Sequence, residues 1–262
     1  MKENVLERII LPEALQNLVS SGANTIVPED RNHLLALAMG DENNMTFEVA
    51  YDVPDKGRIV EASVVKCKNG VAVNYTDIYM RRRDPDSMIV ADGQETDKPK
   101  YKDIYGESFN SLRGLTFEWL KGQDLIIMPF IAGDLELGYP ALLVAPANAG
   151  FFAAGLADLQ GFIPKEKIPA GFKPKAVIYL APTFRHTHFQ GKQIVVHNRL
   201  EDMHEVFSYN LYPGPSAKKG IYGVLLNIGE LEGWVTAHAS TVKVVTPYEN
   251  IIIIMHEGAS GG

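Results

Sequence analysis

The chain has 262 residues, of which 46% are hydrophobic and 22% charged, and its formal net charge is −7. This balance is that of a globular chain long enough to bury a full core, and it excludes a disordered polymer. The negative charge argues against nucleic-acid or anionic-membrane partners, so an anionic substrate would need a local basic site.

Cysteine content and the start of the chain indicate a cytoplasmic protein. Cys67 is the only cysteine, which excludes an intramolecular disulfide and a thiolate metal cluster. Charged residues at positions 2, 3, 7 and 8 interrupt the apolar start, so it lacks the core of a signal peptide. The longest apolar run, 251–255, is far shorter than the ~20 residues of a membrane span.

Periodicity predicts the elements of the first half. Helices are expected over 11–19, with Pro12 in the first turn, and over 33–39, where Gly40 follows. The pattern from 45 to 79 is strand-like, with strands at 46–51 and 71–75, and the polar stretch 93–108 is expected to be a surface loop.

The second half mixes strands with one small-residue helix. We expect that helix within 145–157, a Pro/Gly loop at 213–215, and strands at 125–130, 176–180, 193–197, 221–228, 242–246 and 249–256. The last strand holds four consecutive isoleucines and is expected to be fully buried. Pattern alone does not separate α/β from α+β; we expect an α/β protein with a mixed α+β sheet.

The residues after the isoleucine strand resemble the start of a phosphate-binding loop. A P-loop follows a strand with G-x-x-x-x-G-K-[ST], and its backbone N–H groups wrap phosphates. Gly258 would be its first glycine, Ala259, Ser260, Gly261 and Gly262 its four variable positions, and Gly-Lys-Ser/Thr would have to follow. The alternative is a flexible Gly/Ser tail or an expression scar.

Two charged segments stand out upstream. Arginines occupy 81–83, shortly before the apolar run 88–90, and a lysine pair follows a Tyr-Pro-Gly turn at 212–214. His238 lies 19 residues after the second lysine and follows the Glu-Gly-Trp of 232–234. Taken singly, a charge run is usually a solvated surface and a lone histidine is usually structural.

These segments, in this order, resemble the N-terminal domain of phosphoenolpyruvate carboxykinase over about residues 75–262. Residues 125–133 and 139–156 are similar to its GTP-dependent branch and look mainly structural. The resemblance implies that Arg82 holds a substrate carboxylate, which a guanidinium matches well. It also implies catalytic positions at Tyr212, with Tyr209 as its rival, and at Lys218.

The resemblance further implies a divalent metal, Mn or Mg, coordinated by Lys219 and His238, and ATP or GTP bound at 258–262. Lysine ligates a metal only as the neutral amine, so Lys219 would need a strongly lowered pKa. The chain departs from the family where Arg81 and Arg83 flank Arg82 in place of a small residue. A divergent relative could therefore phosphorylate another small carboxylate.

The resemblance implies two domains: a substrate- and metal-binding domain over 1–245, and the first strand and partial P-loop of a nucleotide-binding domain over 246–262. We expect this part alone to be inactive in phosphoryl transfer. The strand at 250–256 would be an adhesive edge through which copies of the chain pair.

A non-catalytic metal-binding or assembly domain is the alternative function. Its basis is the Arg-His-Thr-His segment 185–188 together with His197. On a strand, His186 and His188 would lie on one face, as metal ligands often do. The simpler interpretation is a polar loop after the strand at 176–180.

Overall fold

A computed structural model of the chain describes residues 5–81, 87–237 and 239–257. The chain forms two compact units, Met1–Leu225 and Leu226–Gly262. In the described part of the chain, no helix has both the length and the apolar character needed to cross a membrane.

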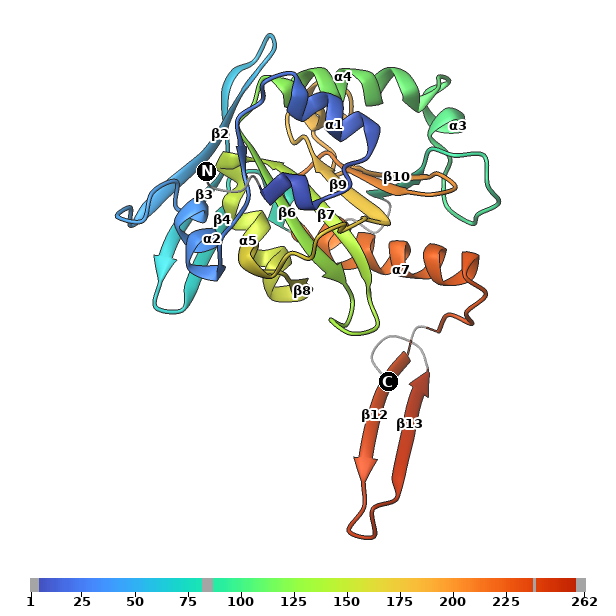
Figure 1. The fold of residues 1–262 in the computed structure, drawn as a ribbon. Coiled ribbons are helices and arrows are strands. Elements are labelled where there is room, and N and C mark those ends of the chain that lie inside the picture. The colour runs from blue at the N-terminus through green and yellow to red at the C-terminus, as the bar shows by residue number, and fades with distance from the viewer. Residues whose placement is uncertain (1–4, 82–86, 238, 258–262) are drawn as a thin grey trace. The chain divides into compact units, whose positions relative to one another are not determined.

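The first unit is built on a mixed sheet of eight strands in the described chain, ordered β1-β6-β7-β9-β11-β10-β5, with β8 paired to β6 (Figure 1). Its strands are β1 (Thr25–Ile26), β5 (Met88–Val90), β6 (Leu125–Ala132), β7 (Tyr139–Pro146), β8 (Gly161–Phe162), β9 (Ala176–Leu180), β10 (Val195–Arg199) and β11 (His204–Ser208). The pairs β7–β9, β9–β11 and β10–β5 are parallel, whereas β6–β7 and β10–β11 are antiparallel. The expected mixed sheet is confirmed.

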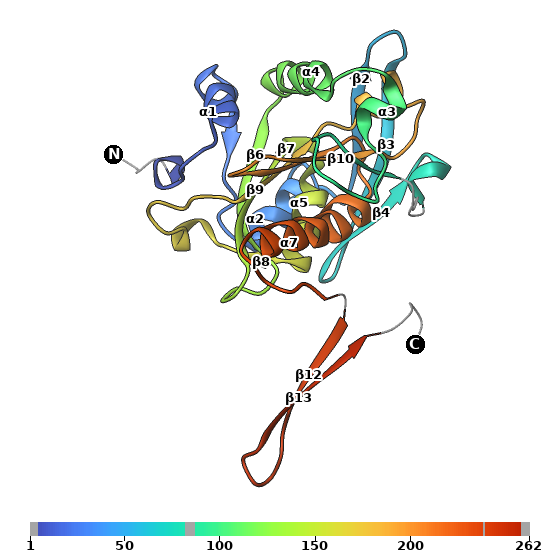
Figure 2. The same cartoon turned by 90° about the vertical axis from the view of Figure 1, so that its right-hand side faces the viewer.

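Helices cover both faces of this sheet. The helices are α1 (Glu13–Ser20), α2 (Arg31–Ala38), α3 (Tyr101–Tyr105), α4 (Phe109–Lys121), α5 (Gly150–Leu159), α6 (Phe184–Thr187) and α7 (Lys219–Leu231). Short 3₁₀ turns occupy η1 (Val5–Arg8), η2 (Ile78–Arg81), η4 (Ala147–Ala149) and η5 (Lys165–Lys167), and η6 (Gly214–Lys218) is a turn of π-helix. Figures 1 and 2 show α1 and α4 on one face and α5 on the other.

The main core lies between α1, α4 and the sheet. Leu15 and Leu112 from the helices pack with Ile127, Leu142 and Phe207 from the strands, and all five are at most 2% exposed. Strands β6, β7 and β9 are buried on both faces, which explains why they are continuous apolar runs with no polar alternation.

A smaller antiparallel sheet of three strands lies between α2 and β5 in sequence: β2 (Thr46–Val53), β3 (Gly57–Cys67) and β4 (Gly70–Tyr75). The β2–β3 turn uses positive φ at Asp55 and Gly57. The end of β4 leads directly into η2, so this sheet delivers the arginine segment toward the central sheet.

The second unit contains a hairpin of β12 (Ala239–Val245) and β13 (Ile251–Glu257). The four isoleucines at 251–254 are 41 to 68% exposed, so the prediction of a fully buried strand was wrong. In the described chain the two strands pair only with each other, and neither face of the pair is covered.

The other helices, strands and loops predicted from the sequence can be compared with the structure one by one. The expected helices and most strands are confirmed within a few residues, and β9 matches its predicted bounds. The strand expected at 221–228 is helix α7, the polar loop 93–108 contains α3, and the loop at 213–215 opens the π-turn. The domain boundary predicted after residue 245 stays a prediction.

Candidate functional site

Four neighbouring strands of the central sheet have one of their ends at the same margin of the sheet, and this margin runs across the strands. The register aligns Met88 of β5 with Val195 of β10, Val195 with Ser208 of β11, and Ser208 with Leu180 of β9. Chain segments that precede Met88 and Val195, or follow Leu180 and Ser208, therefore emerge at this edge. We call it the site edge.

Tyr212 lies in the segment that leaves β11 at the site edge. Its ring meets the ring of Tyr75 edge to face at 5.9 Å, and its backbone N–H donates to Asn210 Oδ1 at 2.9 Å. Gly214 allows this arrangement, because a Cβ there would come within 2.8 Å of the Tyr212 ring.

The rival tyrosine, Tyr209, belongs to the core. Its side chain is fully buried and its hydroxyl shares a hydrogen bond of 3.0 Å with Thr116 of α4. Burial raises the pKa of Tyr209 well above that of a free phenol. Of the two tyrosines, Tyr212 is the one with access to a ligand.

Lys218 and Lys219 follow at the junction of the π-turn and α7. Lys218 is exposed, whereas Lys219 is partly buried with Nζ 5.6 Å from the centre of the Tyr222 ring. The turn is held in place by Gln160, whose Nε2 donates to the Ala217 carbonyl at 3.2 Å. The lysine pair therefore stands on a supported backbone that follows Tyr212 in the chain.

Arg82 lies outside the described residues, and its neighbour Arg81 shows where the arginine segment begins. Arg81 Nε donates to the Tyr75 carbonyl at 3.1 Å, and the Tyr75 hydroxyl donates to the Leu211 carbonyl at 3.0 Å. Burial, with the nearby Tyr212, raises the pKa of Tyr75, so it remains a neutral donor. Tyr75 thus joins the arginine segment to the tyrosine–lysine segment.

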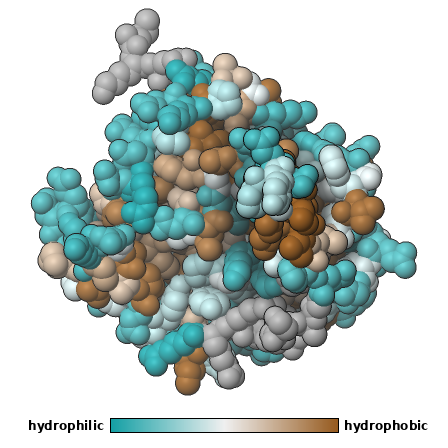
Figure 3. Space-filling view, turned by 90° about the horizontal axis from the view of Figure 1, so that it is seen from below, coloured by the Kyte–Doolittle hydropathy of each residue, from teal (hydrophilic) through white to brown (hydrophobic). Residues whose placement is uncertain are grey.

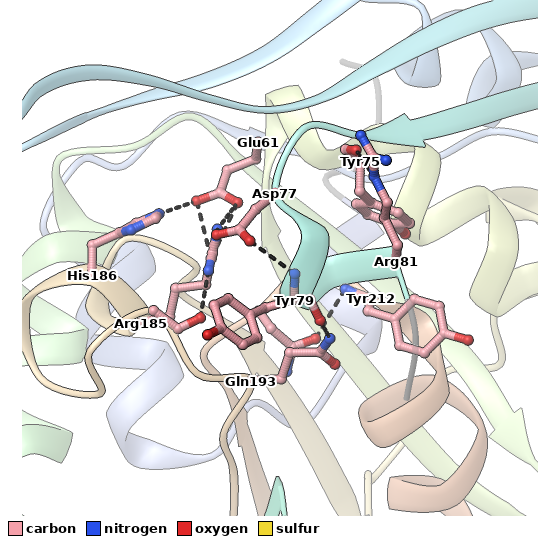
Figure 4. A network of polar contacts seen from close by, with 11 residues as sticks. Glu61, Tyr75, Asp77, Tyr79, Arg81, Arg185, His186, Gln193 and Tyr212 are labelled. Carbon is pink, nitrogen blue, oxygen red and sulfur yellow. Dashed lines mark hydrogen bonds and ion pairs between the residues drawn. The ribbon is translucent and has the colours of Figure 1, made fainter. Parts of the chain in front are cut away.

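A charged network lies next to these residues (Figure 4). Arg185 Nη2 contacts Glu61 Oε2 at 2.9 Å and Asp77 Oδ2 at 3.0 Å, and His186 Nε2 contacts Glu61 Oε1. The side chains of Arg185 and Glu61 are each 1% exposed. Two carboxylates therefore surround one buried guanidinium.

Asp77 is the most open member of the network. Burial alone would raise its pKa, but the hydrogen bond from the Tyr79 N–H and the interactions with Arg185 outweigh burial and hold the pKa below its usual value. Asp77 is therefore a carboxylate at neutral pH, as its pairing with Arg185 requires.

The metal-module hypothesis for 185–188 assumed a strand there, and that premise is wrong. His186 lies in the one-turn helix α6 and His188 is its C-cap, so the two are not on a strand. His197 pairs with His204 through a 2.8 Å contact between ring nitrogens. Among the described residues no group of three or more His, Cys, Asp or Glu is placed to hold a metal ion.

The metal and nucleotide predictions fall largely outside the described residues. His238 and the positions Gly258, Ala259, Ser260, Gly261 and Gly262 are not described, so their predicted roles stay predictions. Among the described residues, the Lys219 ammonium group lies over the Tyr222 ring in a cation–π contact. The described donors do not by themselves fit a metal centre.

Sequence reasoning missed Glu61, Asp77 and Arg185. Glu61 lies in a strand where an acidic residue usually faces solvent, and Arg185 lies in a segment that reads as a polar loop. No local signal separates them from surface charges, because their burial is set by contacts between residues 108 to 124 positions apart.

The described fold is that of an α/β protein with a mixed central sheet, and the candidate site lies at one edge of that sheet. The chain belongs to the family described as domain of unknown function DUF4914, whose sequence model matches residues 11–262. No curated protein matches the chain.

Proposed function

We propose that this chain is the substrate-binding part of a nucleotide-dependent phosphoryl-transfer enzyme that resembles phosphoenolpyruvate carboxykinase and acts on a small carboxylate. Its nucleotide would be ATP or GTP, and its compartment the cytoplasm. The proposal extends to a P-loop at 258–262 and to a divalent ion, Mn or Mg, near Lys219 and His238.

One observation carries this proposal: the chain before the arginine segment is joined to the start of the tyrosine–lysine segment, since the Tyr75 hydroxyl donates to the Leu211 carbonyl, 136 positions away in the chain. Arg81 contacts Tyr75, and Tyr75 contacts both Leu211 and Tyr212. The sequence resemblance had assigned substrate contacts to these same two segments. Their proximity is what a shared anion site requires.

The chemistry available to the described residues suits a small dianion. The arginine segment supplies a planar guanidinium that can hold a carboxylate through two parallel hydrogen bonds. Lys218 supplies a mobile ammonium for a phosphoryl or second carboxylate oxygen, and the Tyr212 hydroxyl can donate a hydrogen bond. These residues bind and orient the substrate; a bound divalent ion would add charge neutralisation of the phosphoryl group.

Binding of phosphoenolpyruvate to the protein, measured by calorimetry, tests the proposal. We expect binding to weaken by about tenfold or more in Arg82→Gln and in Lys218→Ala, because each removes a charge-assisted hydrogen bond. The matched control is Lys121→Ala, which removes an exposed lysine at the end of α4 and should leave the affinity unchanged.

The binding experiment has one outcome that supports the proposal and one that contradicts it. Loss of binding in the site variants alone supports an anion site at this edge. Absence of phosphoenolpyruvate and oxaloacetate binding by the unaltered protein, with Mn²⁺ and nucleotide present, contradicts the proposal. The coding sequence after Gly262 gives an independent check, because a P-loop requires Gly-Lys-Ser/Thr there.

A further inference from the structure

A cavity of about 380 Å³ lies at the margin of the central sheet where β6 begins and β7 ends. Residues from β1, the end of α2, β2, the link before β6, and η4 line it. None of these residues belongs to the candidate site described above. A volume of this size is at the lower end of the range of small-molecule binding sites. The cavity is therefore large enough for a small ligand of its own.

The charge of the lining residues indicates the charge of such a ligand. Asp124 is the only charged residue that lines the cavity in the described part of the chain, and no lysine, arginine or histidine does so. Asp124 is exposed, and it forms no ion pair with a described residue. Its backbone carbonyl accepts from the Ala147 N–H at 2.7 Å, which holds the residue in place. A carboxylate without a partner attracts cations and repels anions.

Two amide side chains add hydrogen-bond acceptors to the lining. Asn148 Nδ2 donates to the Ala50 carbonyl at 2.9 Å, which fixes the orientation of the amide. Its Oδ1 is buried, and no described residue donates to it. Gln123 is oriented in a similar way, since its Nε2 donates to the Trp119 carbonyl. Because a buried acceptor without a donor is unfavourable, this lining favours a ligand that brings N–H groups.

The remaining wall of the cavity is apolar and includes an aromatic ring. Ile26, Leu37 and Phe47 line it. Gly40 allows the Phe47 ring to lie close to the backbone, because a Cβ at Gly40 would come to 2.5 Å from the ring. The same glycine follows the end of α2, where the helix carbonyls carry a partial negative charge. Since the face of an aromatic ring also attracts cations, this wall suits a cation with an apolar body.

An organic ammonium fits this lining better than a metal ion does. Mg²⁺ and Ca²⁺ are held by several oxygen ligands and waters, whereas this cavity combines one carboxylate with apolar side chains. Among the described residues, no three His, Cys, Asp or Glu are grouped to hold a metal ion. A primary ammonium donates up to three hydrogen bonds, and its carbon chain can be buried against the apolar wall.

We propose that this cavity binds a small organic cation, a primary ammonium with an apolar body. Its N–H groups donate to the Asp124 carboxylate and to Asn148 Oδ1, and its body packs against Phe47. This inference is independent of the proposed function, because the cavity shares no residue with the candidate site. The two sites also select ligands of opposite charge.

Titration of the protein with phenethylamine, followed by ligand-observed NMR, tests this inference. Phenethyl alcohol is the matched ligand, because it keeps the ring and the chain and lacks the charge. We expect the amine to bind about tenfold more tightly than the alcohol, because a charge-assisted hydrogen bond to a carboxylate is stronger than a neutral one.

Three variants locate the binding. Asp124→Asn removes the charge and leaves the backbone bond to Ala147 in place, and it should weaken amine binding by about tenfold without changing alcohol binding. Asp103→Asn, at an exposed aspartate of α3, is the matched control and should keep the amine affinity. Phe47→Leu keeps an apolar wall without the ring, and it should weaken amine binding by about threefold.

Absence of amine binding, or equal affinities for the amine and the alcohol, would overturn the proposal. An amine affinity that Asp124→Asn leaves unchanged would overturn it as well. Displacement of the amine by Mg²⁺ or Ca²⁺ at equal concentration would assign the cavity to a metal ion and overturn the ligand class. Failure of the protein to bind phosphoenolpyruvate contradicts only the proposed function, because the amine is measured at a separate cavity.

Discussion

At the scale of single residues, His197 and His204 form a buried pair outside the site. His197 Nδ1 and His204 Nε2 are 2.8 Å apart, and each ring is at most 4% exposed. Burial, with a smaller effect of Arg199 and against that of Asp92, lowers the pKa of His197 to about 4. Burial and the neighbouring ring lower the pKa of His204 as well. Both rings are neutral at neutral pH.

This pair predicts a loss of stability in mild acid. Because the folded-state pKa lies below the unfolded value of 6.5, the unfolded chain binds protons first, and stability falls as the pH drops below 6.5. His197 alone should cost about 2 kcal/mol by pH 5. Asp77 and Asp92 do not contribute in this window, because their pKa values lie below 3.8.

Urea unfolding at a series of pH values measures this slope. His197→Gln should flatten it, and His256→Gln, on the exposed hairpin, should leave it unchanged. A free energy of unfolding that stays constant between neutral pH and pH 5 would contradict the prediction.

Whether a candidate site residue could be predicted depended on whether the local sequence marks it. The order of Arg82, Tyr212 and Lys218 along the chain singled out two segments whose roles stay predictions, and Tyr75 links Arg81 of the first to Leu211 and Tyr212 at the start of the second. The choice between Tyr209 and Tyr212 needed the structure, because it depends on burial beyond the end of β11: Tyr209 enters the core against Thr116, and Tyr212 stays partly exposed. The network of Glu61, Asp77 and Arg185 could not be predicted, because nothing in the local sequence distinguishes a buried charge from an exposed one.

At the scale of elements, α7 shows where periodicity is ambiguous. Ile221, Val224, Leu225 and Ile228 fit a helical face, yet the β-branched residues among them also fit a strand. Packing against the central sheet decides: Ile221 and Val224 are buried, and Gly223 lies against His197. Strands β6 and β9 were easier to predict, because short continuous apolar runs bounded by turn residues favour buried strands, whereas β7 was not predicted as a strand.

Helix α5 offers a matched pair of glycines for a test of packing. A Cβ at Gly150 would lie 2.3 Å from the Leu37 carbonyl carbon of α2, whereas Gly155 has nothing within 4 Å. We expect Gly150→Ala to destabilise the protein by about 3 kcal/mol, because backbone must move to admit the methyl group. Gly155→Ala should stabilise it by about 0.5 to 1 kcal/mol. Urea unfolding of both variants decides, and equal effects would rule out the close α2–α5 contact.

At the scale of the whole molecule, two units of different character share one chain. The first has a continuous core under its central sheet, and the second is a hairpin whose isoleucines are exposed. Figure 3 shows hydrophobic residues open among hydrophilic ones on the face seen from below. The sequence indicated the isoleucine strand correctly, but burial could not be read from it, because apolar runs predict a need for cover and not its presence.

The exposed apolar surface of the β12–β13 hairpin predicts that copies of the protein associate through it. Its strands have open edges and apolar side chains on both faces in the described chain, which is a template for pairing with another copy. Ile253 is 68% exposed and lies opposite Lys243 across the strand pair. Ile253→Glu should therefore keep the hairpin through an opposite-charge pair while removing apolar surface, and it should shift the protein toward monomer in sedimentation velocity.

Leu159→Glu, at an exposed leucine at the end of α5, is the control and should leave the association unchanged. If the unaltered protein sediments as a monomer at high concentration, or if both variants dissociate it equally, the hairpin is not the contact.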